Sequence, residues 1–161
     1  MWSKKTYDNY LLDLEFKTAS GTNSGVIIHT NPTDKWIPNS IEIQIADDFH
    51  EKWKSKGPKW QCGAFFGRKE ASKSLVKIPG EWNRMTIISE GPIVDILLNG
   101  EMVNRMDMRE WTSPTLNPDG STKPKWLKKP LAKHLSEGKI GFQGKHGDAP
   151  IWFRNVRISE L

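Results

Sequence analysis

Residues 40–48 hold the first candidates for chemistry in this chain of 161 residues. Three isoleucines alternate there with Glu42 and Gln44, which is the period of a β-strand whose successive side chains point to opposite faces. Glu42 and Gln44 would then stand about 6.5–7 Å apart on one face. A carboxylate beside a carboxamide can hold a sugar, and the carboxylate can act as an acid or a base. The alternative interpretation is an ordinary strand with a solvated polar face.

Further polar side chains fall on other predicted strands or at strand ends. Strands that neighbour one another in a sheet would gather them into a polar floor on its outer face. Such a floor would offer an acid or base, neutral hydrogen-bonding groups and cations. These candidates are Gln143, Lys145, His146 and Arg154. His29 also lies near a strand end, where a structural role and a functional one both remain open.

Short strands separated by turn residues make up most of the chain, with almost no helical period. The predicted strands are residues 10–17, 26–29, 40–48, 63–67, 81–90, 93–98, 101–107, 139–145 and 151–159. Asn99-Gly100 predicts a tight hairpin, because both turn positions need positive φ. The pattern indicates an all-β fold, an antiparallel β-sandwich, formed by one domain over residues 1–161.

Composition excludes several other classes of protein. At 36% hydrophobic and 27% charged residues the chain is expected to be globular, and no apolar run is long enough to span a bilayer. The net charge is +5, but the lysines cluster in loop-like stretches, so we expect no nucleic-acid partner and no membrane partner. Neither metal-ligand spacing nor a phosphate loop is present, and we expect no metal or cofactor. The single Cys62 is expected to fill apolar space.

Eight tryptophans are many for this length. Burial explains most tryptophans in proteins, but the flat ring also stacks on the C–H face of a sugar. The count therefore favours a carbohydrate ligand without establishing it. The aromatic candidates for a sugar-binding rim are Trp36, Trp53, Trp60, Trp111 and Trp126.

Six short motifs occur together in a fixed order. They are Asn23-Ser24-Gly25, Glu42-Ile43-Gln44-Ile45, Gly80-Glu81-Trp82-Asn83, Leu98-Asn99-Gly100, Gly141-Phe142-Gln143 with His146-Gly147, and Trp152-Phe153-Arg154-Asn155. Together they resemble the 3-keto-disaccharide hydrolase family, over residues 10–161. The resemblance implies a concanavalin A-like jelly roll with a carbohydrate site on its concave sheet. It also implies a secreted or periplasmic role, although no signal peptide opens this chain.

Two departures from the family pattern stand out. The family usually has a further N-terminal segment with a Phe-Asn-Gly-Lys run, which we expect this domain to lack. An arginine usually stands where this chain has His29.

The leading hypothesis is a hydrolase that acts on glycosides oxidised to a ketone at C3. Such a ketone acidifies the hydrogen at C2, so the reaction needs one base and one group that stabilises an enolate. We expect Glu42 or His146 to be the base and Arg154 or Lys145 to stabilise the enolate. The candidates for holding the substrate are Gln44, Gln143, Lys145, Asn23, His29 and Trp111.

Two other hypotheses remain open at this point. The chain could be a non-catalytic carbohydrate-binding module of a larger protein, whose aromatic rim holds a glycan by stacking. It could also be a structural sandwich without a sugar site. The sugar, its linkage and the oligomeric state are not determined by the sequence.

Overall fold

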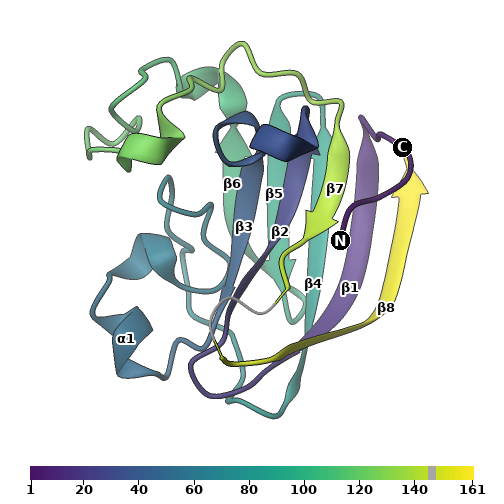
Figure 1. Ribbon diagram of the computed structural model, residues 1–161, viewed down its shortest axis with the longest axis vertical. Coiled ribbons are helices and arrows are strands. Elements are labelled where there is room, and N and C mark those ends of the chain that lie inside the picture. Colours follow the sequence, from purple (N-terminus) through teal and green to yellow (C-terminus); the bar gives the residue numbers. More distant parts are fainter. Residues whose placement is uncertain (145–147) are drawn as a thin grey trace.

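Two antiparallel sheets pack face to face in the computed structural model, which describes residues 1–144 and 148–161 (Figure 1). The larger sheet has the strand order β6-β5-β4-β1-β8 and the smaller has the order β3-β2-β7. The strands are β1 (Tyr10–Thr18), β2 (Asn23–Thr30), β3 (Ile41–Ala46), β4 (Trp82–Glu90), β5 (Ile93–Leu98), β6 (Glu101–Asp107), β7 (Lys139–Phe142) and β8 (Ile151–Glu160). The predicted antiparallel β-sandwich is confirmed.

Helical structure is confined to the connections between strands. The helix α1 covers Glu51–Lys54, and single 3-10 turns cover Thr33–Lys35, Ile37–Asn39, Pro58–Trp60, Met108–Glu110 and Lys125–Leu127. Within the described residues, no helix has the length and apolar character needed to cross a membrane.

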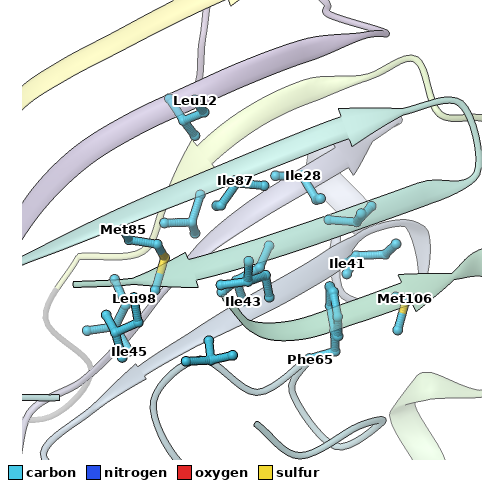
Figure 2. Packing of buried hydrophobic residues seen from close by; sticks show 14 of the residues in the cluster. Leu12, Ile28, Ile41, Ile43, Ile45, Phe65, Met85, Ile87, Leu98 and Met106 are labelled. Carbon is cyan, nitrogen blue, oxygen red and sulfur yellow. The ribbon is translucent and has the colours of Figure 1, made fainter. Parts of the chain in front are cut away.

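The core lies between the sheets and follows the strand alternation. On β3, Ile41, Ile43 and Ile45 are fully buried and face the larger sheet. Figure 2 shows Ile45 beside Leu98 of that sheet, with Ile43 and Ile41 further along the same face of β3. Because the isoleucines take every second position, the intervening side chains of β3 must point to the outer face of the smaller sheet.

The meander β4-β5-β6 forms as predicted. The β4–β5 hairpin pairs continuously from Glu90↔Ile93 to Met85↔Leu98. The β5–β6 hairpin pairs from Leu98↔Glu101 to Ile93↔Asp107, with a register shift between Ile96 and Leu97. At the turn between β5 and β6, Asn99 has φ 52° and Gly100 has φ 90°. These positive values are what a two-residue hairpin requires.

Residues 63–67 were predicted as a strand but form no regular strand. Phe65 makes isolated bridges to Ile43 and to Lys69. The segment still runs beside β3. The amide of Gln44 donates to Ala64 O over 2.9 Å, and the amide of Phe66 donates to Glu42 O over 2.9 Å. Pairing ends at Phe66 because the chain turns back at Gly67, where φ is 65°.

Strand β2 contains a bulge near its C-terminal end, where its pairing with β7 is interrupted. The β2–β7 register shifts between Ile27 and Thr30, and His29 in that interval has φ 54°. A Cβ added to Gly138 would lie 2.4 Å from His29 C and 2.4 Å from Thr30 N. Only a glycine therefore lets the chain before β7 pass this close to the bulge.

We expect Gly138→Ala to lower the free energy of unfolding by at least about 2 kcal/mol, because its methyl group would overlap backbone atoms that cannot rotate away. Urea denaturation measures the change. Gly144→Ala is the control, since no atom of the described residues lies within 4 Å of its added Cβ. Equal stabilities of the two variants would contradict the close approach at Gly138.

Candidate functional site

A cavity of about 310 Å³ opens on the outer face of the smaller sheet. Its volume lies at the lower end of the range for small-molecule sites in proteins. Polar groups from four parts of the chain line it, together with an aromatic and aliphatic wall. These polar groups include Asn23 from β2, Glu42 from β3, Arg68 from the turn after residue 66, and Gln143 just after β7.

Among the described lining residues Glu42 is the one that carries a carboxylate, and it is only 8% exposed. Burial raises the pKa of its carboxyl group from 4.5 to about 7, and the positive charge of Arg68 opposes that rise only in part. A carboxyl group with a pKa near neutrality can exchange protons with a bound ligand in either direction. Glu42 is therefore suited to proton transfer.

Gly25 makes room for that carboxyl group on the neighbouring strand. A Cβ added there would lie 2.6 Å from Glu42 Oε1 and 2.9 Å from Glu42 Cγ. Steric overlap with Glu42 thus explains why the third residue of the Asn23-Ser24-Gly25 motif is a glycine in this fold. It lets the side chain of Glu42 lie across β2.

Arg68 brings a buried positive charge to the same cavity. Its side chain is among the largest that are fully buried, and its Nη2 donates to Ser40 O over 3.4 Å. In the part of the chain that the structure describes, its buried Nε has no hydrogen-bond partner. Burial lowers the pKa of the guanidinium to about 10, so it stays charged at neutral pH. A buried cation with a free N–H group is placed to receive an anionic oxygen.

Two amide side chains and a hydroxyl organise the floor. Gln44 is fully buried, and its Nε2 donates to Asn23 Oδ1 over 3.0 Å, so it stands behind Asn23 rather than in the cavity wall. Ser24 Oγ donates to Gln143 O over 2.7 Å and fixes the backbone there. The buried Oε1 atom of Gln143 has no hydrogen-bond partner among the described residues.

Aromatic rings form the walls of the cavity. Trp36, Phe66 and Trp126 line it, and Trp126 is 52% exposed. Trp60 supports two of them from behind, with its ring centroid 4.7 Å from that of Phe66 and 6.2 Å from that of Trp126. Of the predicted aromatic rim, Trp53 does not take part, because it is buried and donates to Gly21 O over 3.3 Å.

Arg154 is not brought to this cavity. It lies on β8 in the larger sheet, where its Nε donates to Glu15 over 2.6 Å and its guanidinium lies 3.8 Å from the ring of Trp82. Lys17 lies beside it, over the rings of Trp82 and Trp152 at 5.2 and 4.7 Å. Because β8 pairs with β1 and not with β3, Arg154 and Glu42 are on different sheets.

His29 and Trp111 also lie apart from the cavity. The ring of His29 points between the sheets, with Nε2 2.8 Å from Ser89 Oγ on β4, and burial lowers the pKa of His29 to about 3. Trp111 is 2% exposed and donates from Nε1 to Asn117 Oδ1 over 3.1 Å. Neither residue is among those that line the cavity.

Lys145 and His146 lie outside the described residues. Of the predicted site residues, the structure thus brings Asn23, Glu42 and Gln143 together and places Gln44 directly behind them. Within residues 1–144 and 148–161, no group of three or more His, Cys, Asp and Glu side chains could hold a metal ion.

Sequence reasoning missed Arg68, the cation that the cavity does contain. It follows Gly67 in a turn, where no strand period indicates the direction of a side chain. The available signal was an arginine just after an apolar segment, Gly63-Ala64-Phe65-Phe66. That signal becomes specific only once the segment is known to run beside β3.

We expect Glu42→Gln to change how stability depends on pH. Between pH 4.5 and about 7 the folded protein holds a proton on Glu42 that the unfolded chain has lost, so the free energy of unfolding falls as the pH rises through this window. The glutamine variant lacks this loss. From pH 4 to pH 8 its stability should therefore rise relative to wild type by about 3 kcal/mol.

Urea denaturation across this pH range is the measurement, with the exposed Glu90→Gln as control. Parallel curves for wild type and Glu42→Gln would contradict the raised pKa of Glu42.

Comparison with known proteins agrees with this architecture. A candidate glycosyl hydrolase from Parabacteroides distasonis, solved at 2.00 Å, is 53% identical and superposes with a TM-score of 0.97 over 99% of this chain and 82% of its own. A second candidate glycosyl hydrolase from that organism is 24% identical, with a TM-score of 0.79 over 99% of this chain and 73% of its own.

The carbohydrate-binding module CBM66 of Bacillus subtilis shares the fold alone, at 13% identity and a TM-score of 0.59, over 99% of this chain and 80% of its own. Comparison with curated proteins gives no match. The model of the 3-keto-alpha-glucoside-1,2-lyase-like domain matches residues 1–159. The chain therefore belongs to the 3-keto-alpha-glucoside-1,2-lyase-like family, which confirms the resemblance carried by the six sequence motifs.

Proposed function

We propose that the chain cleaves glycosides that carry a ketone at C3, and that the cavity on the smaller sheet is the active site. The observation that carries the proposal is the buried carboxyl group of Glu42, with a pKa of about 7, in one cavity with Arg68. Membership of the 3-keto-alpha-glucoside-1,2-lyase-like family supports the choice of substrate class.

Glu42 is the base in the proposed reaction. Its carboxylate takes the proton from C2, which the neighbouring C3 ketone acidifies, and negative charge moves onto the ketone oxygen. The C1–O1 bond then breaks, a C1=C2 double bond forms, and the leaving oxygen takes a proton. Addition of water, with OH at C1 and H at C2, completes a net hydrolysis.

Arg68 stabilises the enolate in this scheme. Its free Nε–H and its charge can meet the oxygen on C3 as charge develops there. An electrostatic group held in a water-poor site accelerates a reaction because it needs no reorganisation as charge forms. Arg68 replaces Arg154 in this role, since Arg154 lies on the other sheet.

The remaining lining residues hold the sugar. Trp36, Phe66 and Trp126 offer apolar surface for the C–H faces of a pyranose ring. The free Oε1 of Gln143 can accept a sugar hydroxyl, and Asn23 is oriented from behind by Gln44.

Release of the aglycone from a 3-keto-glucoside tests the proposal. We expect turnover by wild type, with kcat/KM rising with pH through about 7 as Glu42 loses its proton. Glu42→Gln should lower kcat by about 10²–10⁴-fold, and Glu90→Gln should leave it unchanged. Tight binding of the keto-sugar without turnover would favour a carbohydrate-binding module instead. Full activity of Glu42→Gln would overturn the assignment of the base.

Arg68→Lys keeps the positive charge but loses the planar fork of N–H donors. We expect kcat to fall by about 10²-fold, with a smaller change in KM, because the interaction strengthens as the enolate forms. Steady-state kinetics at pH 8, where Glu42 is deprotonated, measure the effect. An increase in KM with unchanged kcat would assign Arg68 to ground-state binding instead.

Gly25→Ala tests the position of the Glu42 carboxyl group. The added methyl would overlap Oε1 and Cγ of Glu42 and displace the base, so we expect kcat to fall by about 10²-fold while the chain still folds. The kinetics are read beside a thermal melt, with Gly144→Ala as the matched glycine control. Wild-type kcat in Gly25→Ala would mean that the base does not lie across β2.

A further inference from the structure

The first residues of the chain pair with β7 through backbone hydrogen bonds, without forming a regular strand. Ser3 N donates to Ile140 O over 2.8 Å, and Phe142 N donates to Met1 O over 2.9 Å. Trp2 lies between these bonds and pairs with Gly141. Figure 1 shows the N-terminus beside β7. The segment thereby fixes the backbone of β7 one residue before Gln143, which lines the cavity.

The indole of Trp2 occupies the space where a side chain of residue 141 would be. A Cβ added to Gly141 would lie 2.3 Å from Cζ3 and 2.5 Å from Cε3 of Trp2. Because Ile140 is buried in the core, Gly141 faces the opposite side of the sheet, the side that carries Glu42. Trp2 therefore lies on the outer face of the smaller sheet.

Trp2 packs against Trp36, one of the aromatic residues that line the cavity. Its ring centroid is 6.3 Å from that of Trp36, with an interplanar angle of 63°, an edge-to-face arrangement. Trp36 lines the cavity, whereas Trp2 does not. Trp36 belongs to the loop between β2 and β3, where its neighbours Lys35 and Ile37 are exposed. A loop of this kind needs an external support to hold one ring in place.

We propose that Trp2 is a positioning residue, which holds Trp36 against the sugar in the Glu42 cavity. The inference rests on the proposed function, in that the ligand is a 3-keto-glycoside. Glu42 and Arg68 line the cavity and Trp2 does not, so in this arrangement Trp2 acts on ligand binding and not on proton transfer. An edge-to-face aromatic pair contributes about 0.5–1.5 kcal/mol, which corresponds to a change in affinity of about 2- to 12-fold.

Two variants remove the support in different ways. Trp2→Ala deletes the ring, and Gly141→Ala displaces it without changing a residue that lines the cavity. For both we expect KM for a 3-keto-glucoside to rise about 3- to 10-fold, with kcat within twofold of wild type and the same pH midpoint. Trp2→Phe should restore most of the affinity, because it keeps an aromatic edge.

Matched controls separate this role from a general loss of stability. Trp152→Ala removes a 43% exposed tryptophan from the opposite sheet, and Gly144→Ala adds a methyl group that meets no atom of residues 1–144 and 148–161 within 4 Å. Both should keep the wild-type KM. An equal rise in KM for Trp2→Ala and Trp152→Ala, or a fall in kcat at constant KM, would overturn the proposal.

Calorimetric titration of each variant with the same 3-keto-glucoside distinguishes failure of this inference from failure of the proposed function. If wild type binds without turnover, the proposed activity is wrong, and the role of Trp2 is decided by the change in Kd. If wild type neither turns over nor binds the compound, both proposals are wrong.

Discussion

The alternation of side chains along β3 is the constraint on which both the core and the cavity depend. Ile41, Ile43 and Ile45 fill the space between the sheets, and their spacing forces Glu42 and Gln44 onto the outer face. A shift of one residue in register would put a carboxylate in the core and an isoleucine in the cavity. The hydrophobic packing of the sandwich therefore also positions the candidate base.

Glu42 stands in a site that burial makes unfavourable for its charged form. Segments on both sides of β3 bury Glu42. On one side the backbone amide of Phe66 donates a hydrogen bond to Glu42 O, and on the other side Gly25 leaves room for the carboxyl group. Arg68 compensates for the charge only in part. Such a residue lowers stability at neutral pH, and its retention in the fold is understandable if proton transfer at that position is useful.

The strands could be predicted from the sequence because their signals are local. The alternation in β3 and the Asn99-Gly100 turn each specify a conformation over a few residues, and both occur as predicted. The position of Glu42 on the outer face followed from the same alternation. Sheet membership could not be predicted in this way, because it depends on which distant strands pair.

The failure to place Arg154 illustrates this limit. Its strand forms where the sequence predicts one but joins β1 in the larger sheet, so Arg154 pairs with Glu15 instead of approaching Glu42. Arg68 was missed for the converse reason. It lies outside any alternating sequence pattern, and it reaches the cavity because residues 63–66 run alongside β3.

The outer face of the larger sheet has a practical consequence. Its tryptophan rings already contact Lys17 and Arg154, so they offer few bare platforms for a glycan. The cavity lies on the other side of the sandwich, behind the full thickness of the core. A bead, a sensor chip or a fused carrier attached through the β8 face would leave the mouth of the cavity turned toward solution. A tether on the loop that carries Trp36 would obstruct it.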